Sequence, residues 1–133
     1  MKRALAAGLG ICAIAALSLA GSAGGASAAC VKTNLTTGKN GPGTTVKISS
    51  TSSCNDLNLT AASDHAGYEG YAGYYYKSST SSWVRGSSGY HYTSNFNASS
   101  SSGWIVLLTD ISNGTKVGVA SLWDAGDPVT VAH

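Results

Sequence analysis

The sequence predicts an all-β fold, a single small antiparallel β-sandwich or barrel of about seven short strands, preceded by a cleaved N-terminal signal helix. Three observations predict this fold. Apolar residues recur with the period of two that is typical of strands. Gly, Asn and Ser residues that favour turns separate these runs at close intervals. No window after residue 29 shows the apolar stripe of an amphipathic helix.

The first 28 residues have the three-part order of a secretory signal peptide. Met1–Arg3 is positively charged, Ala4–Ala20 is small and apolar, and Ala26–Ala28 provides an A-x-A cleavage site. We therefore expect cleavage after Ala28, a mature domain over residues 29–133, and a secreted, extracellular location. The Ala- and Gly-rich leader resembles those of exported proteins of high-GC actinobacteria, a general likeness that suggests a bacterial source and identifies no family.

A permanent membrane anchor and a lipoprotein are the two alternatives for this leader. The apolar run is shorter than the roughly 20 residues that span a bilayer, and no stop-transfer charge follows it. A lipid on Cys30 usually requires Leu three residues earlier, where this chain has Ser27. Cleavage is therefore favoured over both alternatives.

The mature chain is neutral. The whole chain has eight Lys and Arg against six Asp and Glu, a net charge of +2. Because Lys2 and Arg3 leave with the leader, six basic residues then face six acidic ones. No cluster of Lys or Arg remains to contact a phosphate backbone, so nucleic acid is not an expected partner.

Two cysteines, Cys30 and Cys54, remain after Cys12 leaves with the leader. In an oxidising compartment only one pairing is possible, and it closes a loop across 24 residues. The chain-entropy account assigns such a loop roughly 3–4 kcal/mol of stabilisation. Neither cysteine has a His at metal-ligand spacing, so a disulfide is favoured over a metal-binding or nucleophilic role.

Aromatic residues compensate for a shortage of aliphatic ones. Residues 29–133 contain 18 Ile, Leu, Val and Phe, against 42 Ser, Thr and Gly. All seven Tyr and all three Trp also lie in this part of the chain. Together with the neutral charge, this composition predicts a folded domain with one thin core rather than a disordered segment.

Several runs predict individual strands. Val46–Ile48 and Leu57–Leu59 alternate apolar with polar residues, as half-buried strands do. Trp104–Leu108 is apolar throughout, which fits a central strand covered on both faces. Asn113–Gly114 separates that run from Lys116–Leu122, and an Asn-Gly pair between two such runs is the strongest short-range hairpin signal. We expect these two runs to pair with each other.

Further turns divide the rest of the chain. Ser78–Ser81 and Gly86–Gly89 are expected as hairpin turns on either side of a strand over Ser82–Arg85. Pro128 is expected to start or border the last strand, Val129–Val131, because proline cannot donate a hydrogen bond to a neighbouring strand.

The densest aromatic segment is Gly67–Tyr76. If it is extended, its tyrosines alternate between two faces, with Tyr68, Tyr74 and Tyr76 on one and Tyr71 and Tyr75 on the other. A tyrosine has a flat apolar ring and a polar tip, which suits stacking on sugar rings and contacts at interfaces. The alternative is that these rings fill a core that is poor in aliphatic residues.

Trp83 and Arg85 share a face of one predicted strand, and Tyr90 and Tyr92 share a face of the next. If the two strands pair, Arg85 lies over a Tyr ring in a cation–π contact. The alternative role for these side chains is cross-strand packing that holds the sheet together. The residues expected to form the binding surface are Tyr71, Tyr75, Trp83, Arg85, Tyr90 and Tyr92.

No catalytic or metal-binding motif is present in the sequence. The histidines at 65, 91 and 133 form no H-E-x-x-H, H-x-H or Cys/His pattern, and there is no G-x-S-x-G elbow. A Ser–His–Asp arrangement leaves no local pattern and stays open. Asp124 and Asp127 flank Ala125–Gly126 and can bind Ca²⁺ in a loop, but such a stretch more often forms a simple turn. We therefore expect no catalytic residue, no cofactor and no metal site.

The favoured function is a secreted, non-catalytic β-domain that acts through an aromatic surface, in cell-envelope adhesion or in carbohydrate or peptide recognition. An extracellular protease inhibitor is the first alternative, with Gly86–Gly89 or Asn97–Gly103 as its reactive loop, although no cysteine ties either loop. A self-associating coat protein is the second, because weakly charged Tyr/Gly/Ser strands are poorly protected against edge-to-edge pairing. Cell-wall polysaccharide or a secreted protein is the expected partner.

Overall fold

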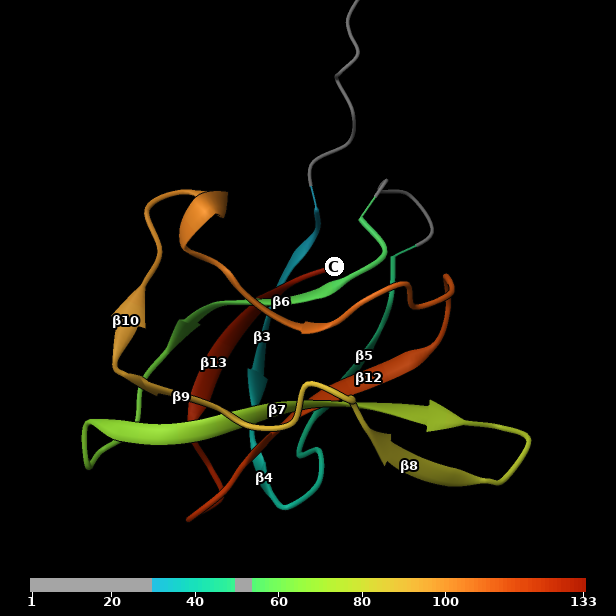
Figure 1. Ribbon diagram of the computed structural model, residues 1–133, viewed down its shortest axis with the longest axis horizontal. Coiled ribbons are helices and arrows are strands. Elements are labelled where there is room, and N and C mark those ends of the chain that lie inside the picture. Colours follow the sequence, from blue (N-terminus) through green and yellow to red (C-terminus); the bar gives the residue numbers. More distant parts are fainter. Residues whose placement is uncertain (1–29, 50–53) are drawn as a thin grey trace, which may run out of the picture.

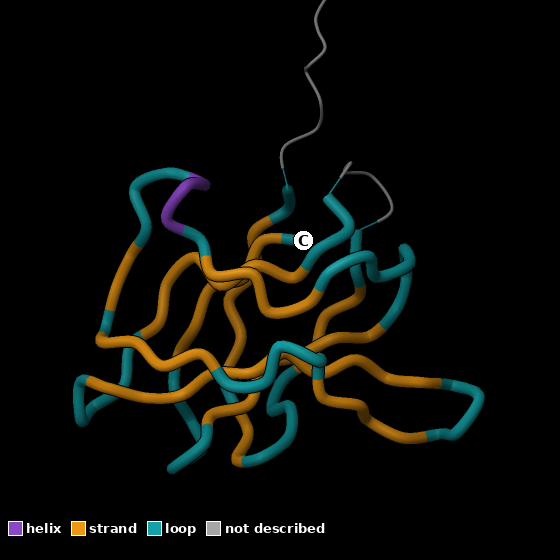
Figure 2. The backbone as a smooth tube through the Cα atoms, in the orientation of Figure 1, coloured by secondary structure: helices purple, strands orange, loops and turns teal. Residues whose placement is uncertain are grey.

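The computed structural model describes residues 30–49 and 54–133, so the predicted leader over residues 1–28 lies outside the described part. Two curled sheets face each other in a β-sandwich-like fold (Figures 1 and 2). The predicted all-β class is confirmed, with eleven described strands in place of the expected seven or so. A short 3-10 helix, Ser101–Gly103, lies in the Ser-rich segment.

The first sheet has five strands, in the order β10–β6–β13–β3, with β11 also paired to β6. All of its pairs are antiparallel. The bounds are β3 Lys32–Thr36, β6 Leu57–Ala62, β10 Phe96–Asn97, β11 Ile105–Leu108 and β13 Pro128–Ala132. Pro128 is the first residue of the last strand, as predicted.

The second sheet has six strands, in the order β4–β12–β7–β8, with β5 also paired to β12 and β9 to β7. Its bounds are β4 Gly38–Lys39, β5 Thr45–Lys47, β7 Tyr68–Lys77, β8 Ser82–Arg85, β9 His91–Ser94 and β12 Lys116–Ser121. β4 pairs parallel to β12, and the other pairs are antiparallel. The ten-residue β7 pairs with β9 along its first half and with β8 along its second half.

One of the two predicted turns beside β8 closes a hairpin. Ser78–Ser81 joins β7 to β8, with the Thr80 amide donating to the Lys77 carbonyl at 3.2 Å. Gly86–Gly89 does not close one, because β8 and β9 both pair with β7 and lie end to end along it. The Gly86 amide donates to the Gly73 carbonyl at 2.8 Å, which keeps the chain running along β7.

The predicted hairpin around Asn113–Gly114 is wrong. β11 belongs to the first sheet and β12 to the second, so this segment crosses from one sheet to the other. The local turn does form, since Gly114 has a φ of 81° and the Thr115 amide donates to the Ser112 carbonyl at 3.2 Å. The amide of Gly114 donates to the Ile48 carbonyl at 2.9 Å, which fixes the turn against the end of β5.

The expected roles of β6 and β11 are exchanged. β6 is buried along almost its whole length and pairs with three strands, where a half-buried strand was predicted. β11 pairs with β6 alone among the described strands, and Val106 is 41% exposed, so it is an edge strand rather than a covered central one. A shift in register between Val106 and Leu108 lets the consecutive residues Leu107 and Leu108 both reach the core.

The core lies between the two sheets and consists mainly of aliphatic side chains with one fully buried ring, that of Tyr71. The side chains of β11 pack directly against the backbone of β7 at Gly73. A Cβ atom at this position would stand 2.7 Å from Leu108 Cγ and 2.9 Å from Leu107 Cβ. A glycine at this position therefore permits the close approach of β7 to β11.

A disulfide joins Cys30 to Cys54, as predicted, with 5.2 Å between the two Cα atoms. It ties the segment before β3 to the segment before β6. In the described residues no helix is long and apolar enough to cross a membrane.

Candidate functional site

Aromatic side chains gather on the outward face of the second sheet. The predicted alternation along β7 is present: Tyr68 is 52% exposed, whereas Tyr71 is 1% exposed and Tyr75 packs against the core. The register continues this face onto β8, where Trp83 lies opposite Tyr76. The outward face of the sheet therefore carries alternate residues of β7 and their cross-strand neighbours.

Three half-exposed rings form a contiguous patch at one end of this face, and we call them the three-ring cluster: Tyr68, Tyr92 and Trp123. Each of them is 52% exposed. The ring centroids lie 6.5 Å apart for Tyr68 and Tyr92, 6.2 Å for Tyr68 and Trp123, and 5.8 Å for Tyr92 and Trp123. Each ring thus contacts the other two, although they come from β7, β9 and the segment after β12.

Gly70 makes room for the three-ring cluster. It lies opposite Tyr92 in the β7–β9 pair, and a Cβ atom on it would stand 2.8 Å from Tyr92 Cε1. The Leu122 amide donates to the Gly70 carbonyl at 2.9 Å, which holds the segment carrying Trp123 against β7. The bare backbone at Gly70 thus lets the ring of Tyr92 lie close over the sheet.

A second set of contacts pairs cations with rings on the same face, near the end of β7 that pairs with β8. Arg85 lies over the ring of Tyr90 at 5.4 Å, and Lys116 lies over the ring of Tyr76 at 5.1 Å. Trp83 meets Tyr76 edge-on, with 5.4 Å between the centroids. Burial raises the pKa of Tyr90 to about 12. Arg85 thus lies over a tyrosine ring, but the pairing of its strand with the next, on which that expectation depends, is absent because β8 and β9 each pair with β7.

The six residues expected to form a binding surface divide between the two faces of the sheet. Trp83, Arg85, Tyr90 and Tyr92 take part in the ring contacts of the outward face. Tyr71 and Tyr75 point inward, so the two tyrosines chosen from β7 are those on its core face. The expectation that Tyr71 lies at the surface is therefore wrong, because the residue belongs to the core. Its hydroxyl donates to Asp127 Oδ2 at 2.9 Å, and burial raises its pKa well above the usual range.

Sequence reasoning missed Trp123. It follows the last apolar residue of the run that forms β12 and lies immediately before the turn with Asp124. The available signal is its position beside a turn, because a large ring there has few neighbours to cover it.

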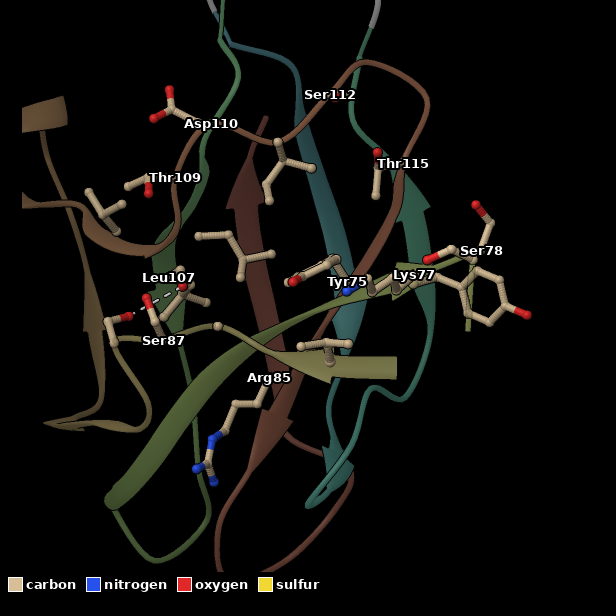
Figure 3. A pocket seen from close by; sticks show the side chains of 18 residues that line it. Tyr75, Lys77, Ser78, Arg85, Ser87, Leu107, Thr109, Asp110, Ser112 and Thr115 are labelled. Carbon is tan, nitrogen blue, oxygen red and sulfur yellow. Dashed lines mark hydrogen bonds between the residues drawn. The ribbon is translucent and has the colours of Figure 1, made fainter. Parts of the chain in front are cut away.

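A groove of about 880 Å³ opens between the two sheets, beside β8 and β11 (Figure 3). Its apolar wall includes Tyr75, Leu107 and Ile111, and its polar wall includes Lys77 and Asp110. Figure 3 shows Tyr75 reaching toward the middle of the groove, while the side chain of Arg85 points away from it. Tyr76 and Arg85 line the groove and also take part in the ring contacts of the outward face, so the two surfaces adjoin at β8.

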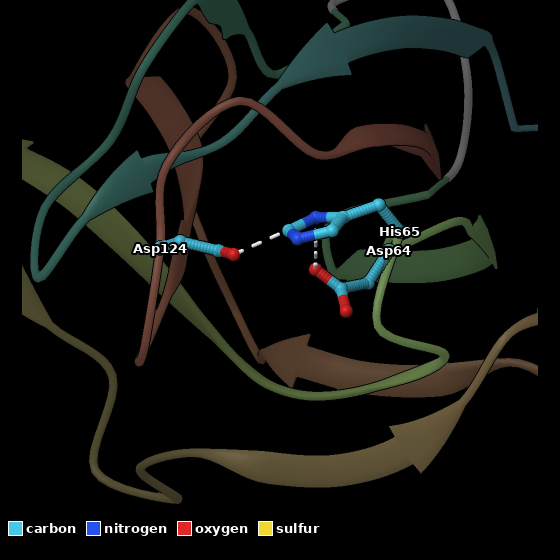
Figure 4. A group of neighbouring side chains, drawn as sticks. All are labelled: Asp64, His65 and Asp124. Atoms are coloured by element: carbon cyan, nitrogen blue, oxygen red, sulfur yellow. Dashed lines mark ion pairs between the residues drawn. The ribbon is translucent and has the colours of Figure 1, made fainter.

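Four carboxylates converge at the end of the sandwich that also carries the three-ring cluster. One oxygen from each of Asp64, Glu69, Asp124 and Asp127 lies within 4.8 Å of the others, and we call this set the carboxylate cluster. Asp64, Glu69 and Asp127 are buried. His65 Nδ1 lies 3.8 Å from Asp64 Oδ1 and 3.6 Å from Asp124 Oδ2 (Figure 4). The sequence drew attention to Asp124 and Asp127 but not to the two acids that join them.

Burial also changes the acidity of two members of the carboxylate cluster, Asp127 and Asp124. It raises the pKa of Asp127 to about 6, an effect that the Tyr71 hydrogen bond opposes and the neighbouring Asp64 carboxyl reinforces. The pKa of Asp124 is likewise raised by desolvation and by the charge of Asp64. Like charges held close together disfavour full ionisation, so Asp127 and Asp124 retain protons more readily than exposed carboxyls do.

Glu69 links the carboxylate cluster to the three-ring cluster. Its Oε1 atom accepts hydrogen bonds from the amides of Gly70 at 2.7 Å and Trp123 at 3.2 Å. Its Oε2 atom accepts from the amide of Asp124 at 3.3 Å. Trp123 is therefore held in place through its backbone by a buried carboxylate.

A Ser–His contact is present on the loop after β8. His91 Nε2 lies 3.0 Å from Ser88 Oγ, and Ser88 Oγ in turn donates to the Leu107 carbonyl at 3.4 Å. The Ser88 hydroxyl thus holds the loop against β11.

Comparison with known proteins provides no relative of known function. The chain matches no protein-family model and has no significant match among curated proteins or solved structures. Any function must therefore be inferred from the geometry of these residues.

Proposed function

We propose that this protein is a secreted, non-catalytic β-domain that binds carbohydrate of the cell envelope through the outward face of its second sheet. The observation that carries the proposal is the three-ring cluster, in which Tyr68, Tyr92 and Trp123 contact one another while each leaves about half of its surface in water.

The exposure of these rings supports a binding role over a packing role. A ring that only completes a core is covered by its neighbours, as Tyr71 is. A contiguous patch of exposed apolar surface is uncommon on a soluble domain and typically marks an interaction site. The three-ring cluster adds little to the core, because Tyr68 and Tyr92 lie on the solvent face of the sheet and Trp123, in the segment after β12, is equally exposed.

The chemistry of the patch favours a neutral sugar polymer over a charged ligand. Flat rings with polar tips offer stacking surfaces together with hydrogen-bonding groups at their edges. The part of the chain after residue 28 has equal numbers of acidic and basic side chains, so it lacks the positive field that phosphate-rich partners require. The cation–ring contacts of Arg85 and Lys116 further occupy two of the exposed charges on this face.

Binding to insoluble glycans tests the proposal. Wild type, Trp123→Ala and Tyr92→Ala are incubated with purified cell wall, and the bound fraction is measured by sedimentation. We expect each variant to lose about tenfold in affinity with little change in thermal midpoint. Trp104→Ala is the matched control, because Trp104 lies under Lys32 and directly precedes β11 of the first sheet, whereas Tyr68 and Tyr92 belong to the second.

Two results contradict the proposal. One is equal binding by the wild type and both cluster variants. The other is an equal loss in Trp104→Ala, which would trace the effect to the removal of any tryptophan rather than to this face.

Secretion forms part of the same proposal. It is supported by the order of the leader and by the Cys30–Cys54 disulfide, which persists in an oxidising compartment. Expression of the full chain in an exporting host, followed by N-terminal sequencing of the released protein, should give Ala29 as the first residue. An uncleaved chain that stays with the cells would contradict this part.

A further inference from the structure

The carboxylate cluster concentrates negative charge at one point of a nearly uncharged molecule. It contains four of the six acidic residues in the chain. In the described part of the chain, the only basic side chain paired with it is His65, which is 82% exposed and carries charge only when protonated. The cluster therefore holds up to four negative charges with no compensating cation that is buried with them.

Two of its buried oxygens have no hydrogen-bond donor in the described structure. They are Asp64 Oδ1 and Asp124 Oδ1. Asp64 as a whole is 3% exposed, and its other oxygen accepts from the Ala66 amide at 2.8 Å. A buried carboxylate oxygen without a partner is costly, and a bound cation is one of the arrangements that removes this cost.

We infer that the carboxylate cluster is a binding site for one Ca²⁺ ion, held by Asp64, Glu69, Asp124 and Asp127. The ligand set consists of carboxylate oxygens, which hard cations prefer. Oxygens on opposite sides of one Ca²⁺ stand about 5 Å apart, twice the Ca–O distance, so oxygens within 4.8 Å of one another can share a single ion. Mg²⁺ fits less well, because it usually keeps several waters and is seldom held by protein ligands alone.

An entry route to this site exists. The Asp124 side chain is 42% exposed, and His65 covers the same side with most of its ring in water. Because His65 sits at ion-pair distance and not at hydrogen-bond distance from both aspartates, it can move aside when a cation takes its place.

Occupation of the site has a consequence for Trp123. Asp124 follows Trp123 in the sequence, and Glu69 accepts hydrogen bonds from the amides of both residues. A cation that draws these two carboxylates together fixes the segment that carries the ring. The Ca²⁺ site stands independently of carbohydrate binding, but it would order one of the three rings that the proposed function uses.

Calcium titration of chelator-treated protein tests the inference. We expect calorimetry to give one Ca²⁺ per chain and the tryptophan fluorescence to change over the same concentration range. The thermal midpoint should rise by about 10–20 °C when Ca²⁺ is 100-fold above its Kd. Asp64→Asn and Asp127→Asn should abolish the response, and in chelator they should be at least as stable as wild type, because each removes a repulsive charge.

Asp110→Asn is the matched control, since it removes the same charge outside the cluster. Asp110 has a φ of 54°, a conformation that asparagine adopts readily, so the exchange leaves the backbone undisturbed. This variant should respond to Ca²⁺ as wild type does.

Three outcomes overturn the inference: no heat and no thermal shift for wild type at millimolar Ca²⁺, a full response in both cluster variants, or an equal loss in Asp110→Asn. A stronger response to Mg²⁺ than to Ca²⁺ overturns the choice of ion. If the cluster variants do not fold, the calorimetry of wild type alone decides. None of these readouts depends on a glycan, so failure of the proposed function is recognised separately.

Discussion

The hydroxyl of Tyr71 donates a 2.9 Å hydrogen bond to Asp127 Oδ2, joining the inward face of β7 to the residue before β13. Both residues are buried. The bond therefore connects the second sheet to the first through the carboxylate cluster, and it places a neutral donor where the cluster has an excess of acceptors.

Removing this donor should destabilise the fold. Tyr71→Phe keeps the ring in the core but removes the hydrogen bond to Asp127 Oδ2. The loss of a donor to a buried acceptor costs about 1–3 kcal/mol of stability. For a domain of this size the thermal midpoint should fall by about 4–8 °C per kcal/mol. Tyr75→Phe is the control: its half-buried ring keeps its packing, so the variant should unfold close to wild type. Equal midpoints for Tyr71→Phe and wild type would show that the bond contributes nothing.

Tyr71 also shows that the period of two predicts which side chains share a face of a strand but not which face is buried. Alternation along Gly67–Tyr76 separated Tyr71 and Tyr75 from Tyr68, Tyr74 and Tyr76 correctly, because side-chain direction in a strand is a local property. Which set faces the core depends on the sheet packed against it, and that is set by residues far along the chain. For this reason the sequence alone does not tell which set is exposed, and the prediction that Tyr71 and Tyr75 lie at the surface is wrong.

The same distinction explains the remaining differences between prediction and structure. The turn at Ser78–Ser81, the start of β13 at Pro128 and the disulfide depend on local chemistry or on a single possible pairing. The Asn113–Gly114 signal predicted a turn correctly, but no local signal tells which sheet the next strand joins. The carboxylate cluster was missed because Asp64 and Asp127 are brought together only by the topology.

Two glycines of β7 should respond differently to the same substitution. Gly73→Ala places a Cβ atom 2.7 Å from Leu108 Cγ in the core, and such overpacking costs about 1–3 kcal/mol. Gly70→Ala meets instead the exposed ring of Tyr92, at 2.8 Å from Cε1, and this ring can shift outward. We expect a clear loss of stability from the first and a two- to tenfold loss of glycan affinity, about 0.5–1.5 kcal/mol, from the second.

Gly41→Ala is the control for both glycines, because a Cβ atom there meets nothing within 4 Å. Chemical denaturation gives the stabilities, and cell-wall sedimentation gives the affinities. A Gly70→Ala variant that binds as tightly as Gly41→Ala would show that the position of the Tyr92 ring does not matter for binding.

The Cys30–Cys54 disulfide should contribute a large part of the stability. It closes a loop of 24 residues, for which the chain-entropy account gives about 3–4 kcal/mol. The double variant Cys30→Ser/Cys54→Ser should therefore unfold at a much lower denaturant concentration than the wild type. Reduced wild type should behave like the double variant, and a difference between them would point to an effect of the serines themselves.

His133 should make the fold sensitive to acid. It is 3% exposed, its Nδ1 atom accepts from the Ser49 amide at 3.2 Å, and its Nε2 atom lies 2.9 Å from Thr33 Oγ1. Burial lowers the pKa of His133, so the fold favours the neutral ring. The stabilisation due to the neutral ring is complete above the unfolded pKa of about 6.5 and is lost as the pH falls through the lowered value.

A comparison with His133→Asn isolates this effect. Asparagine retains an acceptor for the Ser49 amide and does not titrate in this range. Between about pH 7.5 and pH 5, wild type should lose more stability in urea unfolding than the variant does. Asp127 acts in the opposite sense, because its raised pKa of about 6 makes the fold gain stability on acidification. This gain is the same in the wild type and in His133→Asn, so it cancels when their stabilities are subtracted. Parallel stability curves for the two proteins would mean that His133 keeps the same protonation preference when the chain unfolds.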